Sequence, residues 1–283
     1  STISRNIYLK KNKYIPLYGA GFIIFSVLIY LTIPIFFNYD KSKLENTICK
    51  DLNIKCLIDG KIGYSFLPSP RIKIKDLIIQ DFVDKKRALG KIEDVAIKLS
   101  FYNLSNKNKL NFTKIVLQNA EINFDLRELK KYKNFFEKKF SSKPINLKKG
   151  EINFFNGEKD IATIKDIKFK YKTSKNTEEA ILKGNFLNDD IYINLKNKKK
   201  DNNLSRVFIL KLLDTKTKVD VFNSSLDKNI ISGNVSFKKG KNRLTSIFDY
   251  KEDQIIFKQS NLRNAFLDGK FDGTVKFLPY FNF

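Results

Sequence analysis

The sequence VAIKLSF, at residues 95–101, is the stretch that decides the fold of this chain. Apolar residues occupy every second position, and Ala96, Lys98 and Ser100 stand between them. Successive side chains of a β-strand point to opposite faces, so a period of two predicts a strand with one apolar face and one polar face. What covers the apolar face is the main question that the sequence raises.

The same period of two recurs along the chain from residue 72 onwards. Segments rich in Gly, Asn and Lys separate the alternating runs, as turns do between strands. Further runs lie near residues 207–213, 219–222, 235–237, 255–257 and 275–277. The apolar members that we predict to share one face of a sheet are Ile72, Ile74, Val95, Ile97, Leu99, Phe101, Ile122, Phe124, Ile152, Phe154, Ile167, Phe169, Tyr171, Ile191, Ile193 and Leu195.

Two segments after residue 40 have a helical period. Residues 41–52 place apolar side chains four apart, and residues 126–140 place them on one stripe. We therefore predict a mainly β protein with few short helices, built on a long antiparallel sheet. A dozen strands about 4.8 Å apart would span roughly 55 Å, and an open sheet of that width must curl, split or cover its apolar face. Curvature into a groove around lipid chains and packing into a closed core are both consistent with the pattern.

Residues 14–39 contain no charged side chain and form one apolar segment. Its apolar part, residues 17–37, is long enough at about 1.5 Å per residue to cross a hydrocarbon core of about 30 Å. The apolar region of a secretory signal is shorter, about 7–15 residues. A stretch this long without charge also argues against a buried core helix. We therefore predict a single transmembrane anchor at residues 14–39.

Charges on the two sides of this anchor predict its orientation. Arg5, Lys10, Lys11 and Lys13 precede it with no acidic residue among them. A short basic leader usually stays in the cytoplasm, whereas long domains cross membranes largely regardless of charge. The expected organisation is therefore a cytoplasmic leader at 1–13, the anchor at 14–39 and a β-rich body at 40–283 on the far side of the membrane.

The whole chain is strongly basic, with 54 Lys and Arg residues against 30 Asp and Glu residues and a net charge of +24. Such a charge attracts polyanions. Only seven of the cations are arginines, however, and specific recognition of bases and phosphates favours the bidentate fork of Arg. We expect a largely solvated lysine surface and no nucleic-acid partner.

The composition excludes several catalytic and metal sites. The chain contains no His, which rules out a Ser-His-Asp triad, a Cys-His pair and a His-ligated metal. Two cysteines are too few for a four-cysteine zinc site. Adjacent acids such as Asp189 and Asp190 usually lie solvated in turns. We expect no catalytic residue, no metal and no cofactor, and so a protein that is not an enzyme.

The passage after the anchor resembles the start of an AsmA family protein. Residues 51–81 place Gly60 between two short strands, then a Phe-Leu-Pro corner at 66–68, then an amphipathic strand. Residues 90–126 resemble the family's pair of strands linked by a small turn. The sequence KKGEINFFN, at residues 148–156, resembles its later strand, after an intervening helix.

This resemblance implies an inner-membrane protein of a Gram-negative bacterium, with a groove-shaped β-sheet in the periplasm. It further implies a role in outer-membrane biogenesis, in which the groove binds or conducts the acyl chains of membrane phospholipid. The sixteen apolar positions named above would then line the groove, and the alternative is that they fill a closed core. A second hypothesis is a membrane-anchored assembly factor or scaffold that pairs its sheet edges with outer-membrane proteins. The apolar C-terminal end suggests that the chain is a fragment, truncated within a further strand.

Cys49 and Cys56 lie seven residues apart, at the end of a predicted helix and on the strand that follows. In an oxidising compartment such a pair can form a disulfide that closes a small loop. Free cysteines are also among the most buried residues and pack as small hydrophobes. The sequence alone leaves both interpretations open.

Overall fold

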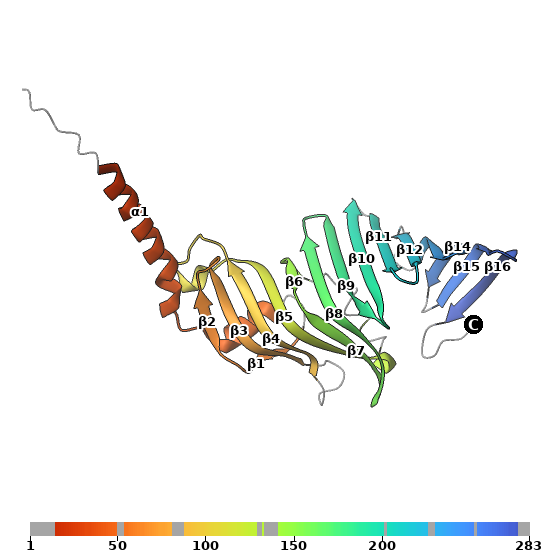
Figure 1. Cartoon of the computed structure of the whole chain (residues 1–283), viewed down its shortest axis with the longest axis horizontal. Coiled ribbons are helices and arrows are strands. Elements are labelled where there is room, and N and C mark those ends of the chain that lie inside the picture. Colours follow the sequence, from red (N-terminus) through yellow and green to blue (C-terminus); the bar gives the residue numbers. More distant parts are fainter. Residues whose placement is uncertain are drawn as a thin grey trace, which may run out of the picture.

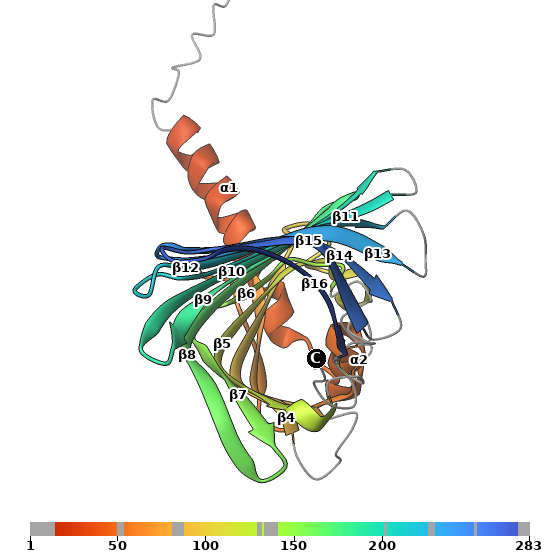
Figure 2. The same ribbon diagram turned by 90° about the vertical axis from the view of Figure 1, so that its right-hand side faces the viewer.

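The computed structural model describes residues 15–49, 54–80, 88–128, 132, 141–200, 203–225, 230–251 and 254–276. Within these residues the chain forms an N-terminal helix α1, a short helix α2 and one 16-stranded sheet (Figure 1). Figure 2 shows that the sheet is curved. The helical elements are α1 (Ile15–Thr32), η1 (Ile33–Phe36), α2 (Lys41–Cys49), η2 (Lys107–Lys109) and η3 (Leu126–Glu128).

The strands follow one another along the sheet almost in chain order. Their bounds are β1 (Cys56–Ile58), β2 (Ile62–Ser65), β3 (Arg71–Gln80), β4 (Ala88–Leu99), β5 (Phe112–Asp125), β6 (Ile145–Leu147), β7 (Gly150–Asn156), β8 (Lys159–Thr173), β9 (Thr177–Phe186), β10 (Asp189–Lys200), β11 (Asn203–Leu212), β12 (Thr217–Ser225), β13 (Ile231–Lys239), β14 (Asn242–Lys251), β15 (Gln254–Arg263) and β16 (Asp268–Lys276).

The pairing confirms the predicted fold class, a mainly β protein with a large curved antiparallel sheet and few helices. From β8 to β16 every strand pairs with the next in an antiparallel meander. The exception is β5, which pairs in parallel with both β6 and β7. A long connection, residues 126–144, separates β5 from β6, and only a connection of such length lets a chain return in the same direction.

Helix α1 rises away from one end of the sheet (Figure 1). Residues Tyr18–Phe36 are long and apolar enough to cross a membrane, and their side chains are mostly exposed. The helix is therefore compatible with a single-pass membrane anchor. Its end is tied to the sheet, because Tyr64 Oη donates a 2.8 Å hydrogen bond to Leu31 O and Tyr30 Oη donates one of 2.9 Å to Phe101 O.

The two predicted helices of the body are only partly described. Helix α2 begins at Lys41 as predicted and is described to Cys49, while residues 50–53 lie outside the described residues. Of the helix predicted at 126–140, the described part contains the short turn η3 and a helical Tyr132. The predicted leader at 1–13 also lies outside the described residues.

The alternation of the N-terminal strands contains one step of three residues. In β3 both Ile74 and Leu77 are buried, although strict alternation would turn them to opposite faces. Asp76 between them has a positive φ of 52°, by which the chain absorbs the extra residue. The equivalent steps, with same-face residues three apart, are Ile92 and Val95 in β4, Leu117 and Ala120 in β5, and Ile164 and Ile167 in β8. The break between β6 and β7 lies beside the step in β5, because Leu117 pairs with Leu147 at the end of β6 and Ala120 pairs with Gly150 at the start of β7.

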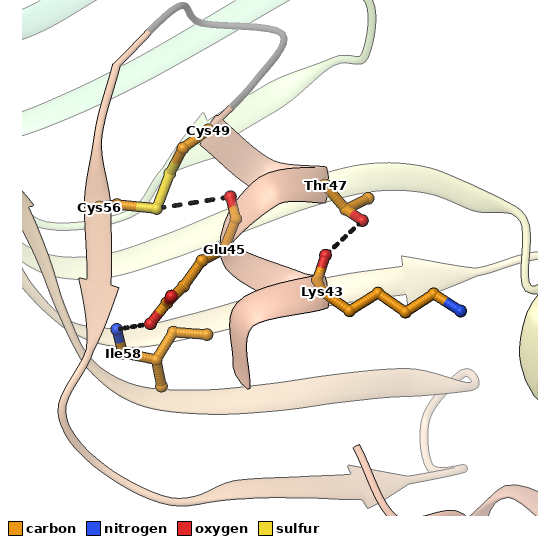
Figure 3. Close-up of a disulfide and its surroundings, with 6 residues drawn as sticks. All are labelled: Lys43, Glu45, Thr47, Cys49, Cys56 and Ile58. Atoms are coloured by element: carbon orange, nitrogen blue, oxygen red, sulfur yellow. Dashed lines mark hydrogen bonds between the residues drawn. A yellow bond between two sulfur atoms is a disulfide. The ribbon is translucent and has the colours of Figure 1, made fainter. Parts of the chain in front are cut away.

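Helix α2 packs on the apolar face of the first strands. Leu44 and Ile48 are buried in a cluster with apolar residues of β3 and β4. A disulfide joins Cys49 at the end of the helix to Cys56 on β1, whose Cα atoms are 6.2 Å apart (Figure 3). In the same view Glu45 Oε1 accepts a 2.6 Å hydrogen bond from Ile58 N. The helix is thus held to β1 at two neighbouring points.

We predict that replacing both cysteines by serine lowers the free energy of unfolding by about 2–3 kcal/mol, because the disulfide restricts the unfolded chain. Urea unfolding of the detergent-solubilised chain measures this difference. A thiol assay of the denatured wild-type protein should find no free thiol before reduction and two afterwards. Equal thiol counts before and after reduction would show that the disulfide does not form.

Candidate functional site

Cross-strand pairing aligns apolar side chains into two adjacent rows on one face of the sheet. Residues directly opposite each other on paired strands share a face, so the register alone defines these rows. The first apolar row is Ile62, Ile74, Val95, Leu117, Leu147, Phe169, Leu182, Ile193, Leu210, Val219, Phe237, Leu244 and Leu262. The second apolar row is Tyr64, Ile72, Ile97, Ile115, Ile145, Tyr171, Ala180, Leu195, Phe208, Val221 and Val235.

Both rows lie on the concave side of the sheet. Helix α2 buries Leu44 and Ile48 against members of the rows on β3 and β4, and Figure 2 shows α2 inside the curve of the sheet. The first row is apolar at twelve successive positions of the sheet, from β3 to β15. A continuous apolar surface therefore runs along the concave side, across the strands.

Burial divides this surface into two parts. At the N-terminal end Ile72, Ile74, Val95 and Ile97 are at most 1% exposed, so they belong to a closed core beneath α2. From β9 to β15 no member of either row is buried, and Leu195 is 39% exposed. Large apolar side chains are rarely left only half-buried over so many neighbouring strands, and contiguous accessible apolar patches usually mark binding surfaces. The part of the face from β9 to β15 is therefore the candidate functional site.

A small cavity lies where the closed core begins. It has a volume of about 240 Å³ and is lined by Thr47 and Ile48 of α2, Ile97 of β4, and Phe112 and Ile115 of β5, among others. Ile97 and Ile115 belong to the second apolar row. Helix α2 thus covers the N-terminal end of the face without filling all the space beneath it.

Polar residues border the second apolar row on β9 to β12. Glu178, Asn197, Arg206 and Asn223 face one another across these strands and are half-buried. We call them the polar margin. The polar margin lies along the strand ends on one side of the sheet. This is the same side on which β4 ends and leads into the turn that Tyr30 contacts.

The polar margin meets the apolar row through Tyr171. Tyr171 Oη donates to Glu178 Oε1 at 3.1 Å and lies 3.2 Å from Ser141 O. Burial, and then the negative charge of Glu178, raise the pKa of the Tyr171 hydroxyl to about 12. The tyrosine therefore stays neutral at physiological pH and acts as a hydrogen-bond donor at this boundary.

The structure places fifteen of the sixteen predicted apolar positions on this one face. Four of them lie side by side on β5 and β7, outside the two rows: Ile122, Phe124, Ile152 and Phe154. Three others belong to the rows themselves: Phe169, Ile193 and Leu195. The remaining buried positions, which form core and not an open surface, are Ile72, Ile74, Val95, Ile97, Leu99, Ile167, Tyr171 and Ile191. Phe101 does not belong to the face: β4 ends at Leu99, and Phe101 lies in the following turn, 60% exposed.

The sequence-based prediction missed the rows on β11 to β15, including Phe208, Leu210 and Phe237. In β11 the residues of both faces are apolar, because Val207 and Ile209 alternate with them. Periodicity therefore could not assign the face. The pairing of β11 with β10 assigns the face, because Leu210 stands opposite Ile193 and Phe208 opposite Leu195, and this pairing is not encoded in the local pattern of β11.

Asp189, one of the two adjacent acids that a catalytic hypothesis would need, has a structural role in a turn between strands. Asp189 accepts hydrogen bonds from Thr215 Oγ1 at 2.7 Å, from Asp214 N at 2.8 Å and from Thr215 N at 3.1 Å. Burial alone would raise the pKa of Asp189, but these hydrogen bonds hold it below its ordinary value. The carboxylate fastens the start of β10 to the turn between β11 and β12. Asp190 next to it points to the opposite face of β10.

Comparison with known proteins identifies a family for the N-terminal half. Residues 9–143 match the sequence model of the AsmA family. The match covers the apolar helix, α2 and the strands as far as the connection after β5. Neither the curated proteins nor the solved structures contain a match to the chain.

We predict that a cysteine introduced at Leu195 reacts rapidly with a water-soluble maleimide, whereas one at Ile97 reacts slowly. Both residues belong to the second apolar row, but Leu195 is 39% exposed and Ile97 is 1% exposed. The native cysteines are joined in a disulfide, so the introduced thiol is the reactive one. Labelling rates in the folded protein, compared with rates in urea, measure the difference. Equal protection of both thiols would show that something covers the face at β10.

Proposed function

We propose that this chain, an AsmA family protein through residues 9–143, holds the acyl chains of membrane phospholipid on its two apolar rows. The proposal is for a non-enzymatic protein of envelope biogenesis, anchored in the inner membrane by α1 with its sheet in the periplasm. The observation that carries it is the uninterrupted first apolar row, whose members from β9 to β15 are all only half-buried.

The dimensions of this surface suit an acyl chain. The seven strands from β9 to β15 span about 29 Å at about 4.8 Å per strand. A lipid chain spans half of a hydrocarbon core, about 15 Å, so it would cross three or four strands along the rows. Burial of ten methylenes at about 0.8 kcal/mol each would contribute roughly 8 kcal/mol. The affinity gained this way can offset the removal of a lipid from a bilayer only if most of the chain is covered.

The uniformity of the first row supports conduction as well as binding. Each of its positions from β9 to β15 carries Leu, Ile, Val or Phe, so a chain that slides along the row meets no polar interruption. Every step exchanges one apolar contact for a similar one. The second row ends differently, at Ser246, whose Oγ is 2.7 Å from Ser260 Oγ in a buried polar pair.

The polar margin offers a place for the lipid headgroup. Arg206 is half-buried beside the second apolar row and can attract a phosphate. Beside it, Asn197 Nδ2 donates a 3.5 Å hydrogen bond to Glu178 Oε2. Acyl chains on the rows and a headgroup at the margin would match the two parts of a phospholipid.

We predict that a photo-crosslinking residue at Phe208 captures phospholipid in membranes, and that the same residue at Ile209 captures much less. The two positions are neighbours on β11 and equally half-buried, but they point to opposite faces. Mass spectrometry of the crosslinked protein identifies the adduct. Crosslinks from Phe208 to an outer-membrane protein, without lipid, would instead support an assembly factor or scaffold.

We also predict that Leu210→Asp reduces the phospholipid that co-purifies with the protein several-fold, because a carboxylate in the first apolar row must be desolvated by each chain that lies there. The matched control is Ile209→Asp on the other face of the same strand, which should leave lipid content unchanged. Circular dichroism and melting curves of both variants verify folding. An equal loss of lipid in the two variants would contradict the assignment of the face.

A further inference from the structure

A row of cations crosses the opposite, convex face of the sheet. Its members stand directly opposite one another on eight successive strands, from β8 to β15. We call it the cation row, and it consists of Lys168, Lys183, Tyr192, Lys211, Lys218, Lys238, Arg243 and Arg263. At about 4.8 Å per strand it is roughly 34 Å long, with seven positive charges and one tyrosine.

The row is a specific concentration of charge and not an average property of a basic protein. The next row on the same face contains no cation from β9 to β15: its members are Ile181, Asn194, Ile209, Asp220, Ser236, Thr245 and Asn261. Like charges directly opposite each other on paired strands destabilise a sheet. The cations of these strands therefore stand where their mutual repulsion is greatest, and the neighbouring row of the same face carries none from β9 to β15.

Most of these charges have no counter-charge within the described residues. Lys218 pairs with Asp220 at 2.7 Å, and Arg263 lies 3.8 Å from Asp268. Lys168, Lys183, Lys211, Lys238 and Arg243 form no ion pair in the described part of the chain. Five of the eight strands of the row thus carry a cation without an ion-pair partner among the described residues, which an external anion could neutralise.

The surface around the start of the row is hollowed. A cavity of about 630 Å³ is lined by three cations of the row and Tyr192, together with two acidic residues and others: Lys168, Lys183, Tyr192, Lys211, Asp166 and Asp190. Its charged lining thus has three cations against two carboxylates. The ammonium groups of Lys183 and Lys211 lie 5.9 Å and 5.7 Å from the centre of the Tyr192 ring, one from each neighbouring strand. The two ammonium groups thus approach the same ring from the strands on either side of it, and the cavity beside them offers space for an anion.

We propose that the cation row is a binding surface for an acidic polysaccharide, a linear chain of sugars that carry carboxylate, sulfate or phosphate groups. A single small anion would neutralise only the two or three charges at the cavity, whereas a linear polyanion matches the whole length of the row. Five of the seven cations are lysines, which are hydrated point charges that tolerate a range of anion geometries. The apolar rows lie on the other face, so this proposal is independent of lipid binding.

The same surface is a poor match for nucleic acid. Single strands are bound through aromatic side chains on which successive bases stack. The cation row has a single ring, Tyr192, and two ammonium groups already lie over it. Two arginines at one end of the row provide little bidentate recognition of bases or phosphates.

The test measures binding of fluorescently labelled polygalacturonate and heparin oligosaccharides to the full chain in detergent, by fluorescence anisotropy. The row variant combines K168Q, K183Q, K211Q and K238Q. The control variant combines K73Q, K91Q, K172Q and K196Q, four exposed lysines of the same face outside the row, so that both variants lose the same net charge. Melting curves establish that each variant is folded.

We expect the row variant to bind at least about tenfold more weakly than wild type and the control variant to stay within about threefold, with the salt dependence of binding reduced in the row variant alone. Equal weakening of both variants would mean that net charge, and not the row, attracts the polysaccharide, and would overturn the proposal. So would a wild-type protein that binds neither oligosaccharide at low salt. Tighter binding of a single-stranded oligonucleotide of equal charge would assign the row to nucleic acid instead.

Discussion

The register between neighbouring strands is the constraint on which the rest of this structure depends. Side chains in a strand alternate with a period of two, so a slip of one residue would move every apolar side chain of a strand to the polar face. Here the pairing keeps apolar residues opposite one another at twelve successive sheet positions, from β3 to β15, in spite of local bulges, and the result is two continuous surfaces of opposite character. The apolar rows and the cation row are products of the same pairing. Tight turns with positive φ, as at Leu187 and Asn188, fix that pairing locally for each hairpin.

The sheet handles its apolar face in two different ways. At the N-terminal end α2, held by the disulfide between Cys49 and Cys56, covers the face and creates a core. The line of three-residue steps through β3 to β8 lies in this same part, and it requires close backbone approach: a Cβ on Gly150 would lie 2.7 Å from Ala120 O. Beyond β8 the alternation is regular over six strands, and the members of the two apolar rows are half-buried or exposed, although single residues of the same face such as Ile191 and Phe248 are buried. Stability is thus concentrated near the anchor, and the distal strands depend mainly on their hydrogen bonds and half-buried rows.

The sequence predicted the class of the fold and the N-terminal apolar helix, because these follow from local periodicity and from the absence of charge. It predicted a common face for positions as distant as Ile74 and Leu195 for the same reason. It could not predict that Ile74 would be core and Leu195 exposed, since burial depends on where α2 lies and not on the alternation. The face of β11 was hidden by apolar residues on both sides. Phe101 was misplaced because the alternation continues by chance past the end of β4 at Leu99.

An uncovered apolar face carries a risk that the chain must limit, since such surfaces associate with one another. The distribution of charge offers one physical answer. Two copies that approached through their convex faces would bring their cation rows together and repel each other, whereas the apolar rows carry no charge that would oppose an approach through the concave faces. Lysines on the convex face therefore limit association at that face and leave the rows without charge, where a desolvated ammonium would block the apolar path. Separation of the two chemistries onto opposite faces follows directly from the period of two, and the same register that makes the rows continuous keeps them apolar.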